Sequence, residues 1–334
     1  MGSDECESGG HKAEELTAQE TALYDRQIRV WGVDAQRRLS KSHIMVSGIT
    51  GATAEFCKNI VLAGIGSLTL MDQQLVTEEA LQANFLIPLD GTDYGEKSLA
   101  ELCCNSLRDF NPMVQVSFVS GNLLQFDGEF FDKFDAVIVG HSSSTTKKII
   151  NEKCRNRPKP VAFYTVDCRD SFGEIFVDLQ NYTYSKKTKD GSTTKCCMTY
   201  PSIEDAIAVP WKELPKRVTK LYFAMRVIEK FEHSNGRKYG ETGVSDLSDI
   251  LNLRKELCAS QALNESHIPV KLLERVLAAG GKEHPPVCSI IGGTLGQEVI
   301  KAMSGKGDPI KNYYYFDSYD GKGVIEDISI PIAT

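Results

Sequence analysis

Three features that mark special classes of protein are missing from this sequence of 334 residues. No apolar run approaches the roughly 20 residues that a membrane-spanning helix needs. The formal net charge of −7 is unsuited to nucleic acid or an anionic membrane surface as the main partner. The ten cysteines include no Cys-x-x-Cys pair, so we expect reduced thiols, mostly in the core, and no metal site.

What is present is an ordinary globular composition, 41% hydrophobic and 25% charged, with enough chain to bury a substantial core. Residues 1–16 are polar and acidic, which is unlike a signal peptide and typical of a disordered tail. No internal repeat or low-complexity tract follows. Residues 17–334 are therefore expected to form a single domain.

Alternating strand and helix signals begin soon after the tail. Thr17 and Glu20 form a capping box that predicts a helix through Ile28, and a second short helix is expected over 34–39. Strands are predicted over 43–49, 67–71, 114–119, 134–139, 160–166, 175–179, 313–317 and 323–328. Longer helices are predicted over 52–63, 96–110, 144–155, 214–231, 247–258 and 286–303. This order is typical of an α/β fold with a Rossmann-like, doubly wound, mostly parallel sheet. Residues 181–210 lose periodicity and are predicted to be a crossover loop.

The turn after the first strand carries part of a nucleotide-binding pattern. Gly48 can make the tight bend, and Asp72, 24 residues later, stands where a ribose-binding carboxylate belongs. Gly51 is also present, but Thr50 and Thr53 occupy positions where glycine would admit a phosphate and a neighbouring strand. The pattern therefore leaves two interpretations, a nucleotide site or a Rossmann-like turn with vestigial Gly48, Gly51 and Asp72.

Several segments together resemble the ubiquitin-like activating enzyme family. They cover nearly the whole chain and are Tyr24 to Gly32, Asn59 to Gly64 with Leu68 to Asp72, Asn111 with Pro112, Pro286 to Lys301, and Tyr313 to Asp317 with Asp320 and Gly321. The resemblance implies the ThiF type of adenylation domain. Within the family, the length of the chain is similar to that of the small, regulatory subunits of SUMO-activating enzymes. The segments Leu39 to Ser42 and Cys168 to Asp170 resemble plant versions of these subunits.

Most of the catalytic parts of competent family members are missing here. Residues 81–85 lack the arginine found before Gln-Phe, and Ser98 falls near the phosphate-binding lysine, although Lys97 is its neighbour. Residues 139–145 lack the Mg²⁺-binding aspartate. Nothing beside Cys196 or Cys197 indicates thiolate activation. The resemblance therefore implies an inactive, pseudo-adenylation domain that binds no cofactor itself.

The resemblance also implies what this chain contributes. ATP, Mg²⁺ and the catalytic cysteine would belong to a larger catalytic partner that activates SUMO, with the complex in the nucleus and possibly also the cytoplasm. Arg26 would reach across the dimer to the phosphates in the partner's ATP site, a task that suits a forked, permanently charged guanidinium. The alternative for this helix is an ordinary surface with an ion pair between Asp25 and Arg29.

Two other functions fit parts of the pattern. A self-sufficient homodimeric adenylyltransferase for a ubiquitin-like or sulfur-carrier protein would need the arginine, aspartate and glycines that are missing. An NAD-dependent dehydrogenase is compatible with Asp72, but Thr50 stands where the pyrophosphate would approach.

Overall fold

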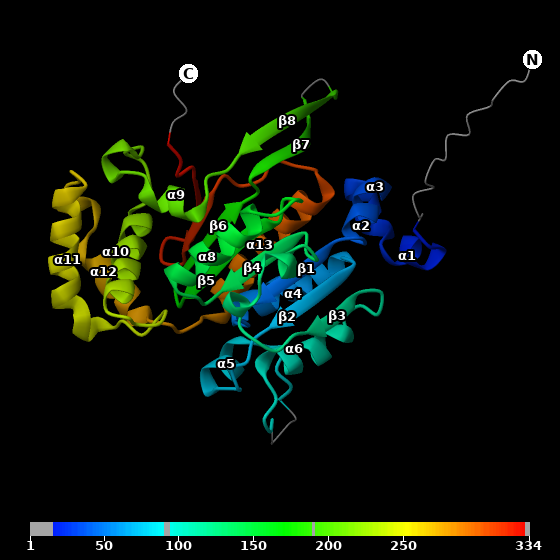
Figure 1. Ribbon diagram of the computed structural model, residues 1–334, viewed down its shortest axis with the longest axis horizontal. Helices are drawn as coiled ribbons and strands as arrows, with labels where there is room; N and C mark the ends of the chain where they lie inside the picture. The colour runs from blue at the N-terminus through cyan, green and yellow to red at the C-terminus, as the bar shows by residue number, and fades with distance from the viewer. Residues whose placement is uncertain (1–15, 90–93, 189–190, 331–334) are drawn as a thin grey trace, which may run out of the picture.

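The computed structural model describes residues 16–89, 94–188 and 191–330. Its centre is an eight-stranded sheet with helices on both faces (Figure 1). The strands of this sheet are β1 (His43–Ser47), β2 (Ser67–Met71), β3 (Gln115–Phe118), β4 (Ala136–Gly140), β5 (Ala162–Arg169), β6 (Phe172–Asp178), β9 (Tyr313–Asp317) and β10 (Lys322–Glu326).

The strand order is β10-β9-β6-β5-β4-β1-β2-β3. Neighbouring strands from β3 to β5 pair in parallel, whereas β6, β9 and β10 pair antiparallel. The chain leaves β1 toward β2 and β3 and later returns to β4 on the other side. The carboxyl ends of β1 and β4 therefore flank the switch point where such sheets bind ligands. The predicted doubly wound, mostly parallel α/β fold is confirmed.

Two hydrophobic cores fill the space between the sheet and its helices. Ile44 and Val46 point into the core shared with α4, α6 and α13, while Met45 points into the core shared with α8, α10 and α12. A parallel strand buried on both faces explains the unbroken apolar run of β1. The helices are α1 (Ala18–Leu23), α2 (Asp25–Trp31), α3 (Val33–Leu39), α4 (Gly51–Ala63), α5 (Glu78–Ala83), α6 (Leu99–Arg108), α7 (Gly128–Phe131), α8 (Ser144–Arg155), α9 (Ile203–Ala208), α10 (Lys220–Ser234), α11 (Leu247–Ser260), α12 (Val270–Ala279) and α13 (Pro285–Ser304).

The N-terminal helix differs from its prediction by a break at Tyr24. The capping box of Thr17 and Glu20 is present, but α1 ends at Leu23 and α2 starts at Asp25. Tyr24 is only 2% exposed. Its hydroxyl accepts a hydrogen bond of 2.9 Å from the side-chain amide nitrogen of Asn111. The break turns this ring inward while the helices on either side stay at the surface.

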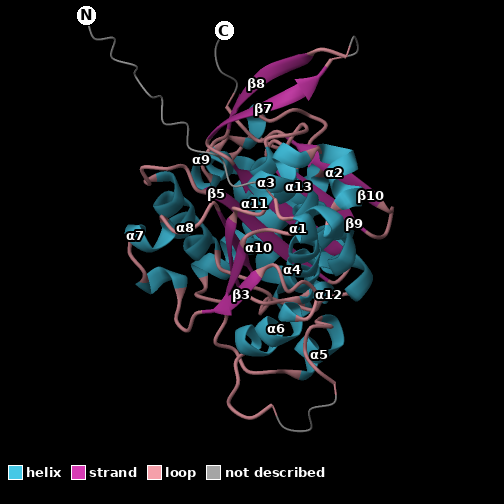
Figure 2. Ribbon diagram, turned by 90° about the vertical axis from the view of Figure 1, so that its right-hand side faces the viewer, coloured by secondary structure: helices cyan, strands magenta, loops and turns pink. Residues whose placement is uncertain are grey.

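The segment predicted as an irregular crossover loop over 181–210 is instead largely ordered. It forms an antiparallel hairpin of β7 (Asn181–Lys187) and β8 (Thr193–Thr199), followed by α9. Figure 2 shows the hairpin projecting from the body of the protein. Tyr182 and Tyr184 face inward with Met198, and the positions between them are exposed. This period of two is hard to recognise in the sequence because the outer positions carry lysines and threonines.

Two further expectations concern the N-terminal tail and membrane-spanning helices. The acidic tail predicted over 1–16 lies outside the described residues apart from Leu16, so it stays a prediction. Among the described helices, none is both long and apolar enough to cross a bilayer.

Helices α4 and α13 approach each other unusually closely at Gly292. A Cβ atom at this position would lie 2.5 Å from the carbonyl oxygen of Ala52 and 2.6 Å from the Cβ atom of Glu55. The next residue, Gly293, points outward, where the nearest atom would be 3.9 Å away. The two adjacent glycines therefore have different roles, and only Gly292 permits the contact.

Replacing Gly292 with alanine should push α13 away from α4 and destabilise the fold by about 2 kcal/mol or more. Gly293→Ala is the matched control, and its higher helix propensity should leave stability unchanged or raise it by up to about 1 kcal/mol. Urea unfolding of the two variants measures both effects. Equal stability of the two variants would contradict this account of the contact.

Candidate functional site

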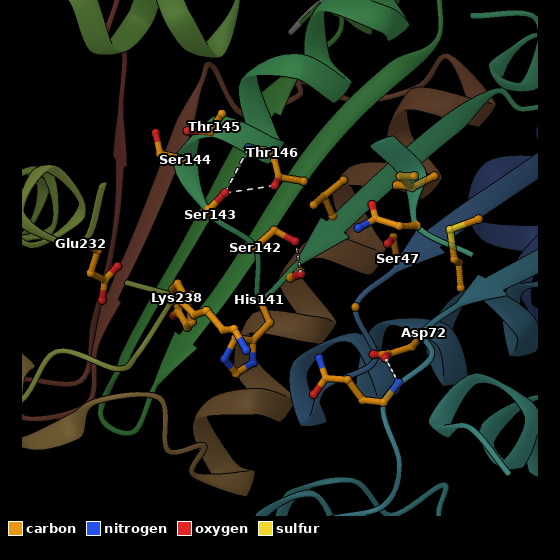
Figure 3. Close-up of a pocket in the computed structure, with 18 of the residues that line it drawn as sticks. Ser47, Asp72, His141, Ser142, Ser143, Ser144, Thr145, Thr146, Glu232 and Lys238 are labelled. Carbon is orange, nitrogen blue, oxygen red and sulfur yellow. Dashed lines mark hydrogen bonds between the residues drawn. The ribbon is translucent and has the colours of Figure 1, made fainter. Parts of the chain in front are cut away.

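A cavity of about 760 Å³ opens at the switch point of the sheet. Figure 3 shows hydroxyl side chains at the end of β4 and the start of α8, with Asp72 on one side and Lys238 and Glu232 on the other. The lining includes Ser47, Gly48, Asp72, residues 139–146, Glu229, Glu232, His233 and residues 236–239. The cavity thus lies where nucleotides bind in open α/β sheets.

Gly48 forms the bend between β1 and α4. Its φ of +84° favours glycine, and a Cβ atom would lie 2.2 Å from the carbonyl oxygen of Gly140 on β4. The side chain of Thr53 packs against the same strand end, because a Cβ atom on Gly140 would lie 3.0 Å from its methyl group. The bend is therefore conventional, but a threonine methyl fills the space that a third glycine would leave.

The two threonines of the turn form a capping box at the start of α4. The hydroxyl oxygen of Thr50 accepts a hydrogen bond of 3.2 Å from the backbone amide of Thr53. The hydroxyl oxygen of Thr53 accepts one of 2.7 Å from the amide of Thr50. Both threonines therefore stabilise the helix start and satisfy two amides that could otherwise face a ligand.

Carboxylates from distant parts of the chain satisfy the remaining amides of the turn. Asp72 accepts a hydrogen bond of 2.7 Å from the amide of Ile49. Glu283 accepts bonds of 2.7 Å and 3.3 Å from the amides of Gly51 and Ala52. Burial raises the pKa of Asp72, although the amides of Ile49 and Gln74 lower it in part. Every backbone amide from residue 49 to 53 thus has an acceptor within this chain.

The other predicted site positions offer little to a phosphate. Lys97 is exposed and is not among the residues that line the cavity. Ser98 caps α6 by accepting a hydrogen bond from the amide of Glu101. Residues 139–145 line the cavity with hydroxyls and one imidazole but supply no carboxylate. The cavity's carboxylates are Asp72, Glu229 and Glu232.

Beneath the cavity lies a network of buried ion pairs that sequence reasoning missed. It joins Lys147 to Asp167, Arg169 to Glu232, and Arg226 to Glu174 and Glu229. Burial alone would lower the pKa of Lys147, but the surrounding carboxylates raise it overall. Arg226 and Glu229 lie three residues apart on α10. The other pairs join different elements among β5, β6, α8 and α10, so no local pattern could reveal them. The cavity floor is therefore charged.

Arg26, the predicted trans-acting residue, lies on the surface of α2. Its side chain has no ion pair or hydrogen bond within residues 16–89, 94–188 and 191–330. The surface ion pair considered as an alternative does exist, since Arg29 contacts Asp25 at 2.8 Å. That pair does not include Arg26. Val30 on the same helix is 82% exposed.

Helix α2 is anchored to the C-terminal end of α4. Besides the bond between Tyr24 and Asn111, the side-chain amide of Gln27 donates a hydrogen bond of 3.1 Å to the backbone carbonyl oxygen of Leu62. Asn111 also donates one of 2.8 Å to Val61. The glycine turn lies at the other end of α4, which has 13 residues and is therefore about 20 Å long. Arg26, on α2, therefore lies near the C-terminal end of α4, whereas the chain's own glycine turn lies at its N-terminal end.

Comparison with known proteins places this architecture. The ThiF family model matches residues 24–331. The chain belongs to the ThiF family. It is 63% identical to SUMO-activating enzyme subunit 1B-1 of Arabidopsis thaliana, with 95% of this chain and 98% of that protein covered. Subunit 1A from the same plant is 61% identical, with the same coverage. SUMO-activating enzyme subunit 1 of Danio rerio is 31% identical, with 94% and 96% covered.

A solved structure shows the same fold at low sequence identity. The crystal structure of PaaA aligns with a TM-score of 0.55 and 16% identity, covering 97% of this chain and 77% of that one. At this identity the likeness concerns the fold alone.

One group of side chains in this ThiF domain has the composition of a metal site. Donor atoms of Cys168, Glu283 and Cys288 lie within 4.8 Å of one another. Glu283 already accepts two backbone hydrogen bonds, and the Cys288 thiol lies 3.5 Å from one of its oxygens. These contacts account for the cluster without an ion, and the expectation of no metal stays a prediction.

The occupied amides of the turn predict that the full chain alone binds ATP·Mg²⁺ weakly, with a Kd above about 100 µM. Isothermal titration calorimetry measures this directly. Binding in the low micromolar range would contradict the prediction. The same titration with NAD⁺ tests the dehydrogenase alternative, for which no binding is expected.

Proposed function

We propose that this chain is the regulatory, non-catalytic subunit of a heterodimeric SUMO-activating enzyme. The similarity to three proteins named as subunit 1 of that enzyme supports the assignment. In this proposal the larger partner carries the catalytic cysteine and holds ATP and Mg²⁺, and SUMO is the protein that the complex activates. The complex would be found in the nucleus and possibly also the cytoplasm.

The observation that carries the proposal is the position of Arg26. The guanidinium of Arg26 is exposed and lies outside the ion pair of Asp25 and Arg29. Because α2 packs at the end of α4 that is opposite to the glycine turn, this side chain cannot bind a ligand at the turn of its own chain. It is available to a second protein that docks on the same surface. Leu23 and Val30, which are 55% and 82% exposed, flank it with apolar area that an interface would bury.

The chemistry of adenylation explains why an arginine would be useful there. The C-terminal carboxylate of the modifier attacks the α-phosphate of ATP, and negative charge grows on the phosphoryl oxygens and the departing pyrophosphate. A guanidinium keeps its charge at all relevant pH values and can donate to two oxygens at once. Supplied in trans on a rigid helix, Arg26 would stabilise that charge as an arginine finger does.

A self-sufficient homodimeric adenylyltransferase is the alternative that needs a direct test. Such an enzyme would catalyse ATP–pyrophosphate exchange without a partner when given a candidate modifier. We expect no exchange by the purified chain and rapid exchange after the catalytic subunit is added. Exchange by the chain alone would favour the alternative.

Replacing Arg26 with alanine should slow acyl-adenylate formation by the reconstituted heterodimer about 10–10³-fold, because Mg²⁺ and the partner's own cations would remain. Assembly should be unaffected, since one exposed side chain contributes little to a large interface. Arg26→Lys should recover only part of the rate, because an ammonium cannot donate to two oxygens in a fixed fork. Single-turnover measurement of the adenylate gives the rate of the chemical step.

Arg29→Ala is the matched control, because it removes a neighbouring charge that is paired with Asp25. It should leave the rate unchanged. A slow Arg29 variant beside a normal Arg26 variant would mean that the other arginine acts in trans. Normal rates for both would remove the trans-acting role.

A further inference from the structure

Glu283 occupies the position at the start of α4 that a phosphate has in nucleotide-binding relatives of this turn. Its two carboxylate oxygens accept hydrogen bonds from the consecutive amides of Gly51 and Ala52. The first-turn amides of a helix lack partners within the helix, and its N-terminal end carries a partial positive charge. A phosphate bound after a Rossmann glycine turn satisfies both requirements. Here a carboxylate of the same chain does so.

The fold holds this carboxylate in place by contacts on both sides. The residue before it, Lys282, accepts a backbone hydrogen bond of 2.7 Å from Asp170, and a β-bridge joins Asp170 to Glu283 itself. Two residues later α13 begins, and its contact with α4 at Gly292 fixes the separation of the two helices. Glu283 therefore reaches the turn from a segment 232 residues away without depending on a flexible loop.

We propose that Glu283 is the residue that closes this half of the enzyme to nucleotides, acting as an internal substitute for a nucleotide phosphate. Its negative charge repels a phosphate, and its oxygens occupy the amides that would bind one. The inference rests on the proposed function only in treating the turn as a disused nucleotide site. It does not depend on Arg26 or on a partner.

The proposal predicts that removing the carboxylate creates an anion site. Inorganic pyrophosphate is a suitable probe because it presents phosphate oxygens without requiring a base or ribose pocket. In the full-length chain, Glu283→Ala should lower the melting temperature in chloride buffer, because two amides lose their acceptor. Pyrophosphate at about ten times its Kd should raise the melting temperature of this variant by about 2 °C at constant ionic strength. The wild-type protein should shift by less than about 1 °C, since its amides are occupied.

Two further variants make the result specific. Ile60→Val truncates a fully buried side chain on the same helix, so it lowers stability without touching the turn. It should not respond to pyrophosphate. Glu283→Gln removes the charge, keeps the shape and retains one acceptor oxygen, so its response should lie between those of wild type and Glu283→Ala. It also provides a test if the alanine variant does not fold.

Three outcomes would overturn the proposal. They are a Glu283→Ala variant that responds no more than Ile60→Val, a wild-type protein that responds as strongly as Glu283→Ala, and a Glu283→Gln variant indistinguishable from wild type when the alanine variant cannot be prepared. The experiment uses the chain without a partner, whereas the Arg26 experiment measures chemistry in the heterodimer. Failure of one therefore leaves the other result standing.

Discussion

The close approach of α13 to α4 at Gly292 is the constraint on which the rest of the structure depends. At one end it sets the distance that lets Glu283 reach the amides of Gly51 and Ala52. At the other end α13 supports the N-terminal helices, because the carbonyl oxygen of Ser304 accepts a hydrogen bond of 3.1 Å from Arg38 on α3. One helix pair thus connects the glycine turn to the helices that carry Arg26.

The glycine turn keeps the shape of a nucleotide site, but its hydrogen bonds are made internally. The bend at Gly48 and the carboxylate of Asp72 are where a Rossmann site needs them, yet Asp72 braces the amide of Ile49. Thr50 and Thr53 cap the helix with their own hydroxyls. A buried amide without a partner costs about 1–3 kcal/mol. A turn that has no ligand is therefore more stable when side chains take the ligand's place, which gives a physical reason for threonines at these positions.

The fold could be predicted from the sequence because its signals are local. The apolar runs of β1 and β2 and the capping box at Thr17 each depend on neighbouring residues, and all appear as expected. The hairpin over 181–199 has no clear signal in the sequence because its period of two lies among charged and hydroxyl side chains. Arg26 could be singled out only through the family resemblance, since no local pattern separates it from Arg29.

The contacts that decide the chemistry of the site could not be predicted in this way. Glu283 meets the turn across 232 residues, and the cavity wall at residues 236–239 comes from the segment that follows α10. The ion pair of Lys147 and Asp167 links α8 to β5. Such contacts depend on how layers stack, and the sequence shows only that each residue is polar. A buried polar residue becomes informative only when its partner is known.

The two ends of α4 differ in the charges placed near them. At its start, positive amides are neutralised by carboxylates of the same chain. Beyond its end, Tyr24, Gln27 and Asn111 fix α2 so that an arginine faces solvent outside the local ion pair. These bonds fix the backbone of α2, whereas the exposed side chain of Arg26 keeps its rotamer freedom. Under the proposed function, a domain whose own glycine turn is filled by carboxylates would supply this exposed arginine to the phosphates in its partner's site.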